Sequence, residues 1–190
     1  YQEKLYFRDA TSGSSNWEFQ TSQLFRDVSA WYHCVVAVDT TQASSGNRVK
    51  IYLNGSQITA FGTETQPSQD YDSYVNNTVQ HAIGASKLAS NHYFDGYLAE
   101  FYLIDGTALT PASFGETNSD TNQWVPVKYS GSYGTNGFYL KFQDSSALGD
   151  DSSGNNNDFT VTNLAATDQV LDSPTNNFAT LNPLWMSGSN

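Results

Sequence analysis

Hydrophobic and polar residues alternate with a period of two along most of this chain, and helical periodicity is almost absent. Near the beginning, Leu5 and Phe7 are separated by Tyr6, and Trp17 and Phe19 form a similar run after a Ser- and Gly-rich turn at 11–15. This period places alternate side chains on the two faces of a strand. The pattern predicts a first β-hairpin, with one strand over 4–8 and its partner around 17–20.

Two segments, 31–38 and 97–104, are apolar on both faces rather than on one. Strands of this kind are typical of the middle of a sheet, or of a sheet that is covered on both sides. Cys34 lies in the first segment and is expected to be a small buried hydrophobic residue. It is the single cysteine of the sequence, so no disulfide can form within the chain.

The region between these segments predicts a second hairpin and a loop. Residues 49–53 alternate as a half-buried strand, and Asn54-Gly55 favours a type I′ turn that would pair residues 51–53 with 57–59. Residues 61–78 form a long polar stretch that predicts a functional or mobile loop. Residues 81–84 predict a short strand.

A single helical turn is expected at 110–115, where Thr110 can cap a helix that starts with Pro111 and ends at Gly115. No other helix is expected. The fold class is therefore all-β, an antiparallel β-sandwich with one short helical turn.

The later part of the chain divides by composition into three segments. Residues 117–136 are rich in Ser, Asn, Gly and Thr and predict a connector. Residues 137–165 predict a β-hairpin with strands at 138–142 and 159–162. This hairpin either completes the sandwich or opens a second module. Residues 166–190 predict an extended linker.

Four short motifs give the first part of the chain a family resemblance. They are Trp31-Tyr32-His33, Tyr52-Leu53-Asn54-Gly55, Phe94-Asp95-Gly96-Tyr97 and Ala108-Leu109-Thr110. In this order and spacing they resemble the second half of a laminin-G-like, concanavalin A-like jelly roll. The resemblance implies a β-sandwich over 1–116, the opening strands of which are missing, and a fold that serves as a platform for glycan binding.

The order of the later segments resembles modular tail-fibre-type virion proteins of marine bacteriophages. The residues that carry this resemblance are Trp124-Val125-Pro126, the run 134–140 and the run 172–180. It implies a virion or extracellular location, a homo-oligomer within a fibre, and host-surface glycans or other virion subunits as partners. Because the sequence begins at Tyr1 and reaches a strand almost at once, we expect a segment of a longer or processed protein.

The charge of the chain narrows the range of partners. The net charge is −11 and the pI is about 4.3, so nucleic acid and anionic membrane surfaces would be repelled. No apolar run approaches the length of a membrane span, so no membrane insertion is expected. The acidic residues either maintain solubility or bind a divalent cation.

Catalysis is not expected. Retaining glucanases of this superfamily place carboxylates on one strand face as Glu-x-Asp-x-x-Glu, and that motif is absent here. Glu100 has Leu98 and Tyr102 at the positions two residues away, which favours a structural carboxylate. The three histidines, His33, His81 and His92, give no evidence for a catalytic triad. The sequence therefore predicts no catalytic residues and a protein that is not an enzyme.

Glycan binding is the preferred hypothesis for the polar loops, because sugars combine a C–H face with hydroxyl groups and so need aromatic rings beside polar side chains. The loops 69–74 and 90–93 have this mixture. The candidate glycan-binding residues are Asp70, Tyr71, Asp72, Tyr74, Asn91, His92 and Tyr93. The alternative is that these tyrosines pack the rim of the sandwich or a contact between subunits.

The candidate metal site is the acidic loop 150–158, with Asp150, Asp151 and Asp158 as possible calcium ligands. The alternative is an Asx-rich turn in which these side chains bond their own backbone. No other cofactor is expected.

The preferred function is a non-enzymatic, lectin-like module of a phage virion protein that attaches to host-surface glycans or builds the fibre. A purely structural assembly module, a secreted bacterial adhesin and a polysaccharide-active enzyme domain are the alternatives.

Overall fold

The computed structural model describes residues 3–11, 14–85 and 93–174. In this part of the chain the regular structure consists of β-strands and three-residue 3₁₀ turns, and all strand pairs are antiparallel. The strands are β1 Tyr6–Thr11, β2 Ser14–Thr21, β3 Cys34–Val38, β4 Val49–Leu53, β5 Ser56–Gln57, β6 Phe61–Thr65, β7 Phe101–Leu103, β8 Gly115–Thr117, β9 Trp124–Pro126 and β10 Phe138–Leu140. The expected all-β antiparallel class is confirmed.

The first sheet has the order β1-β2-β6. β1 and β2 form the expected hairpin, in which Phe7 lies opposite Phe19. β6 adds to the other edge of β2, with Glu64 opposite Phe19. The prediction of a loop over 61–78 is therefore wrong for its first five residues, because the alternation of Phe61 and Thr63 with polar neighbours continues the ladder.

The second sheet has the order β3-β4-β5. The expected type I′ turn is confirmed at Asn54 and Gly55, with φ angles of 46° and 81°. It pairs Tyr52 with Gln57 and Leu53 with Ser56, a shorter ladder than the sequence predicts.

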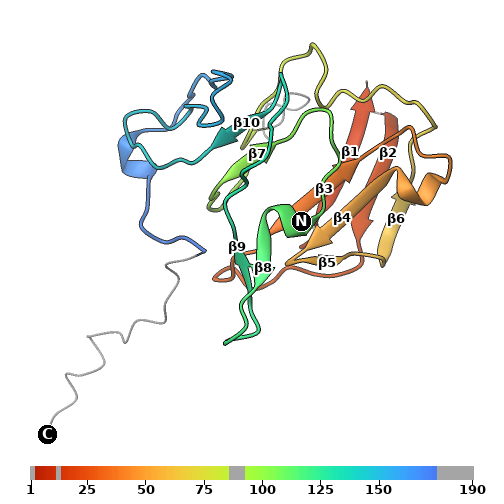
Figure 1. The fold of residues 1–190 in the computed structure, drawn as a ribbon, viewed down its shortest axis with the longest axis horizontal. Coiled ribbons are helices and arrows are strands. Elements are labelled where there is room, and N and C mark those ends of the chain that lie inside the picture. The colour runs from red at the N-terminus through yellow and green to blue at the C-terminus, as the bar shows by residue number, and fades with distance from the viewer. Residues whose placement is uncertain (1–2, 12–13, 86–92, 175–190) are drawn as a thin grey trace, which may run out of the picture.

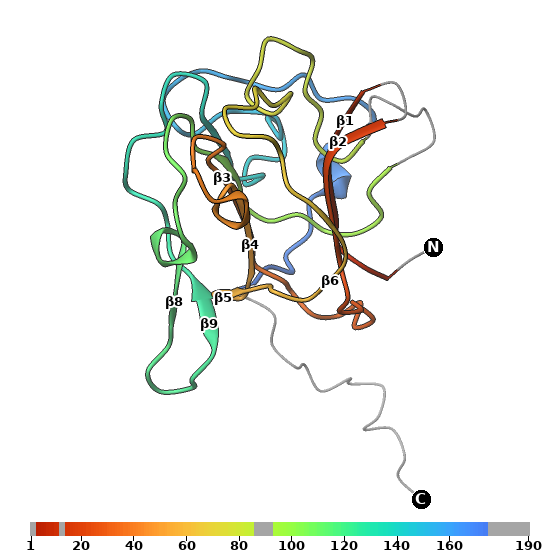
Figure 2. The ribbon, with the colours of Figure 1, turned by 90° about the vertical axis from the view of Figure 1, so that its right-hand side faces the viewer.

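The core lies between these two sheets, which Figure 1 shows one behind the other and Figure 2 shows nearly edge-on. Trp17 and Phe19 of β2 pack with Val49 and Ile51 of β4, and all four are buried. Phe61 closes the cluster, with its ring edge-on to Phe19 at 5.2 Å between centroids. Burial of each large side chain contributes about 1.5–3 kcal/mol, so this cluster accounts for the pairing of the sheets.

The chain after residue 100 forms two small sheets, β7-β10 and β8-β9. Tyr139 of β10 lies opposite Tyr102 of β7, and their rings stack at 4.2 Å between centroids. β10 therefore pairs with a strand of the 1–116 segment. Trp124 of β9 packs against the Asn54-Gly55 turn. It belongs to 117–136, the segment that was expected to be a connector.

The two apolar segments form shorter strands than expected. In 31–38 only Cys34–Val38 is a strand, because Tyr32 instead packs its ring edge-on against Phe25. β3 pairs with β4 on one side only within the described sheets, and Cys34 is exposed rather than buried. In 97–104 only Phe101–Leu103 is a strand, and the positive φ of 53° at Glu100 interrupts the extended backbone before it.

Two further expectations need correction. Residues 81–84 form no strand; the neighbouring Ala85 makes an isolated bridge to Tyr93. Residues 159–162 form no strand either, because Phe159 makes one backbone bond to Gly149 and packs its ring on Phe138.

The helical turn near 110 is confirmed as η2, Pro111–Ser113, but it is not alone. Two more 3₁₀ turns occur, η1 Ser45–Asn47 and η3 Ala166–Asp168. Within the residues placed by the structure, no helix is long and apolar enough to cross a membrane.

Candidate functional site

A broad cleft of about 2840 Å³ opens beside β1 and β3. Its walls come from segments that are far apart in the sequence, mainly residues 5–8, 27–41, 94–104 and 169–174. Pockets for small molecules usually have volumes of about 300–1000 Å³. The cleft is therefore several times larger than a typical pocket for a small molecule.

One wall of this cleft is an aromatic segment that follows Tyr93. Phe94, Tyr97 and Phe101 line the cleft and remain exposed, Tyr97 by 60%. Exposed aromatic side chains that line a cleft are typical of binding sites, because each offers a flat apolar face at little cost in conformational entropy.

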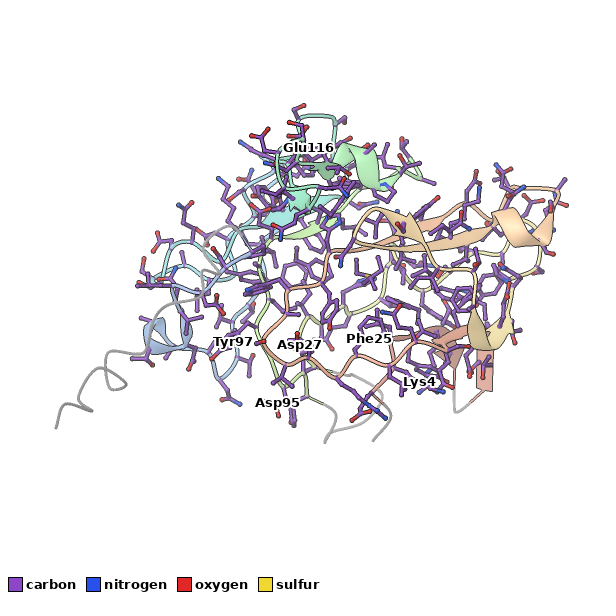
Figure 3. The ribbon with its side chains drawn as sticks, turned by 90° about the horizontal axis from the view of Figure 1, so that it is seen from below. Lys4, Phe25, Asp27, Asp95, Tyr97 and Glu116 are labelled. Atoms are coloured by element: carbon purple, nitrogen blue, oxygen red, sulfur yellow. The ribbon has the colours of Figure 1, made fainter. Side chains whose placement is uncertain are left out.

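Carboxylates line the same cleft as these rings. Figure 3 shows Asp27, Asp95 and Tyr97 on the same side of the molecule, and all three line the cleft. Asp27 accepts hydrogen bonds from the backbone N–H and the hydroxyl of Ser29, at 3.0 and 2.7 Å. The Ser29 hydroxyl and N–H hold the pKa of Asp27 below its usual value, so this carboxylate is charged at neutral pH.

The loop predicted to bind glycan is held in place by a buried carboxylate of β1, Asp9. Its two oxygens accept hydrogen bonds from Asn16 Nδ2 at 2.8 Å, Tyr71 Oη at 3.0 Å, Ser73 Oγ at 2.7 Å and the backbone N–H of Tyr74 at 2.7 Å. Burial by itself would raise the pKa of Asp9, but the hydrogen bonds from Asn16, Ser73, Tyr74 and Tyr71 outweigh it and lower this pKa.

Tyr71 belongs to this network and to the core. Its ring packs against the buried cluster around Phe19, and its hydroxyl donates to Asp9. Burial and the hydrogen bond to the Asp9 carboxylate raise the pKa of Tyr71 to about 12. These contacts orient the loop, so Tyr71 has a structural role in this conformation.

Its neighbours in the predicted set face solvent. Tyr74, Asp70 and Asp72 are exposed. Asp70 has a positive φ of 56° and donates its N–H to the Thr40 carbonyl, while Asp72 accepts a hydrogen bond from Asn77 Nδ2 at 3.2 Å. Their side chains are available to a ligand, and glycan binding by them stays a prediction.

The second predicted loop is described only at its end. Tyr93 is 71% exposed and bridges Ala85, while Asn91 and His92 lie outside the described residues. Ser73 of the first loop lines the cleft, and so does Phe94, which follows the second loop, whereas Tyr74 and Tyr93 themselves do not.

The aromatic wall itself was missed by the sequence reasoning, which assigned 97–104 to a covered strand. A signal was present, because Phe94-Asp95-Gly96-Tyr97 combines aromatic rings with a carboxylate and a glycine. The same composition also occurs at the entry of a buried strand, so the pattern alone does not distinguish the two roles.

Glu100 lies at the end of this wall and contacts the tyrosine stack. Its carboxylate accepts a hydrogen bond from Tyr139 Oη at 2.9 Å and a long one from Tyr102 Oη at 3.5 Å. Burial and contacts with neighbouring groups raise the pKa of Tyr102 to about 12, and that of Tyr139 further still. Both phenols therefore stay protonated donors to Glu100.

The candidate calcium loop is organised by Asp151. Its carboxylate accepts hydrogen bonds from the backbone N–H groups of Tyr139, Ser153 and Asn157 at 2.8–3.0 Å, and from the Ser153 hydroxyl at 2.7 Å. Burial opposes ionisation of Asp151, but these bonds outweigh it and lower the pKa. This is the Asx-turn geometry that the sequence analysis gave as the alternative.

The other two candidate ligands take different positions. Asp158 accepts the backbone N–H of Asp151 at 2.8 Å, and Asp150 is exposed. Among the described residues, no group of three or more His, Cys, Asp or Glu side chains is placed to hold a metal ion. Calcium would also need amide and carbonyl oxygens, so its binding at Asp150, Asp151 and Asp158 stays a prediction.

Comparison with known proteins agrees with this architecture. Neither the curated proteins nor the solved structures include a match to the chain. A laminin G family model, described as the concanavalin A-like lectin/glucanases superfamily, matches residues 2–113, which is more than half of the chain. The chain therefore belongs to the concanavalin A-like lectin/glucanase superfamily.

Proposed function

We propose that this protein is a non-enzymatic, lectin-like module that binds polymeric glycan along the cleft beside β1 and β3. The single observation that carries the proposal is the aromatic wall of Phe94, Tyr97 and Phe101, which is exposed in the cleft that Asp27 and Asp95 also line. Aromatic faces stack on the C–H face of a sugar ring, and carboxylates accept hydrogen bonds from its hydroxyl groups.

The dimensions of the cleft favour a polymer. Its volume of about 2840 Å³ is several times that of a small-molecule pocket. Single contacts to sugar rings are weak, so attachment would depend on several rings bound in a row and on many copies of the module.

A binding role is favoured over hydrolysis because three of the cleft carboxylates, Asp27, Asp39 and Glu100, already have local partners. Asp27 is bound to Ser29, and Glu100 accepts the hydroxyl of Tyr139. Asp39 accepts hydrogen bonds from Thr41 and Gln42 that lower its pKa. A glycosidase needs one carboxyl group with a raised pKa to protonate the leaving group.

We further propose that the module works in a phage virion protein of the tail-fibre type, as a homo-oligomer at the outer surface of the particle. The order of its sequence segments is the support for this setting. Attachment to a host-surface glycan and construction of the fibre are both compatible with it. A secreted bacterial adhesin would use the same cleft.

The test is binding to a glycan array and to immobilised bacterial polysaccharides, with thermal melting to check the fold of each variant. Tyr97→Ala should weaken binding at least roughly tenfold, because stacking on one sugar ring is lost. Tyr74→Ala is the matched control, since Tyr74 is also exposed but lies outside the cleft lining. A glycan-binding protein in which only Tyr74→Ala reduces affinity would move the site to the loop predicted from the sequence.

No binding to any glycan would favour the purely structural assembly module. Release of new reducing ends from a bound polysaccharide would contradict the non-enzymatic proposal and favour a polysaccharide-active enzyme domain.

A further inference from the structure

The aromatic side chain of Trp124 packs the β8-β9 hairpin against the second sheet. The indole covers the turn between β4 and β5, and a Cβ added to Gly55 would lie 2.5 Å from its ring. On the hairpin itself, a Cβ at Gly115 would meet the other side of the same indole at 2.5 Å. The ring therefore lies between two glycines, one on each element.

The polar atom of this indole points at a histidine. Trp124 Nε1 donates a hydrogen bond to His33 Nδ1 at 3.1 Å, and the two ring centroids are 5.8 Å apart. An indole N–H can only donate, so Nδ1 must carry a lone pair and the proton of the neutral imidazole must be on Nε2. The bond exists only while His33 is neutral.

His33 is itself fixed to the same turn. Its backbone N–H donates to Asn54 Oδ1 at 2.9 Å, and its carbonyl accepts the N–H of Asn54 at 2.8 Å. These bonds fix the backbone of His33 beside the turn, with its Nδ1 next to the indole N–H of Trp124. Protonation at Nδ1 would therefore place two donors against each other rather than create a new partner.

We propose that the His33–Trp124 hydrogen bond is a pH-sensitive latch, which holds the β8-β9 hairpin on the β4-β5 turn while the imidazole is neutral and releases it when the imidazole is protonated. Both side chains also line the cleft. Opening of the latch would therefore change one wall of that cleft in mildly acidic surroundings.

The electrostatic surroundings set the pH range of the latch. His33 is half-buried, and this burial lowers its pKa, while the negative charge of Glu100 acts in the opposite direction. Among the described residues, Glu100 is the charged group that acts on the His33 ring. The hydrogen-bond partners of His33, Asn54 and Trp124, are uncharged. Because the folded-state pKa is lowered, the latch is fully formed above about pH 6.5 and is lost as the pH falls through the folded value.

The experiment is a pH titration of the whole chain from pH 8 to pH 5 by ¹⁵N NMR of the indole N–H groups. The signal of Trp124 is identified by its loss in Trp124→Phe. We expect this signal to move with the titration of the His33 ring, at a midpoint below 6.5. Exchange of the indole proton with water, relative to free indole, should become roughly fivefold faster, as for loss of one hydrogen bond.

His33→Asn provides the control, because an amide oxygen can accept the indole N–H at all pH values. The titration of the Trp124 signal should then disappear. The proposal is overturned if the Trp124 signal stays constant while His33 titrates, or if it still titrates in His33→Asn.

A second measurement does not depend on the fold of His33→Asn. Trp124→Phe keeps an aromatic ring at this position and removes the N–H. The loss of stability in urea between pH 8 and pH 5 should then be smaller than in the unmodified chain. An equal loss in both proteins would also refute the latch. Neither experiment uses a glycan, so failure of the proposed binding function would not affect the outcome.

Discussion

Asp9 provides the sharpest test of how the loop 70–76 is held against the first sheet. The side chain is only 3% exposed, yet it is ionised and accepts four hydrogen bonds from two other segments of the chain. Asp9→Ala would leave all four donors without their acceptor. Asp9→Asn would keep the shape, but turn an NH₂ group toward two of them.

The magnitude follows from the number and type of these bonds. A hydrogen bond to a charged group contributes about 1.5–3 kcal/mol, and contributions to one carboxylate are not additive. Removal of one partner from a buried charged network usually costs about 3–5 kcal/mol. We therefore expect Asp9→Ala to reduce the free energy of unfolding by about 3–5 kcal/mol and Asp9→Asn by about 2 kcal/mol. Domains are typically stable by about 5–15 kcal/mol, so either loss is easily measured.

The assay is urea unfolding followed by tryptophan fluorescence, with Asp72→Asn as the matched control. Asp72 is exposed and accepts one long hydrogen bond, so this change should alter stability by less than about 0.5 kcal/mol. Hydrogen–deuterium exchange should also show faster exchange of the Tyr74 amide in Asp9→Ala, because that N–H donates directly to the missing carboxylate.

The effect should also depend on pH in a defined direction. Because the pKa of Asp9 is lower in the folded protein than in the unfolded chain, its contribution is present above about pH 3.9 and is lost as the pH falls through the folded value. The difference in the free energy of unfolding between the unmodified protein and Asp9→Asn should thus be equal at pH 7 and pH 5 and shrink below about pH 4. A loss below 1 kcal/mol for Asp9→Ala, or a difference that grows in acid, would refute this reasoning.

Two further predictions concern the later part of the chain. Gly115→Ala should destabilise the protein by about 1–3 kcal/mol in thermal or urea unfolding, because the added Cβ would overlap the Trp124 ring. Gly46→Ala is the control, since a Cβ there meets nothing within 4 Å and the change should be nearly neutral. Equal effects of the two substitutions would show that the indole can move aside. Because the Asp151 carboxylate already accepts four hydrogen bonds, millimolar calcium should leave the melting temperature unchanged relative to EDTA, and a rise that is absent in Asp151→Asn would instead establish the 150–158 loop as a calcium site.

Local patterns in the sequence were sufficient for the class of the fold and for several of its parts. Alternation predicted the β1-β2 hairpin and β4, and Asn54-Gly55 predicted the turn after it. These features depend on neighbours in the sequence. The period of two is a property of the strand itself, and positive φ angles are accessible to Asn and Gly in almost any context.

The contacts of the candidate site, in contrast, depend on residues that are far apart in the sequence. The sequence could indicate that Tyr71 and Tyr74 share a polar loop, but not that Asp9, more than sixty residues earlier, would take up the hydroxyl of one and the backbone of the other. Buried carboxylates select their donors by proximity in space, and a sequence in which Asp and Ser are common offers many equivalent pairings.

Composition and periodicity by themselves determined an antiparallel β protein with an acidic surface, because these properties are sums over local choices. Only the tertiary structure decided which apolar segments are covered. The sequences of residues 31–38 and 97–104 resemble those of buried strands, yet Tyr97 and Val36 face an open cleft. Burial depends on what packs against a segment, and for these two segments the partner is a distant part of the chain, or none within the described residues.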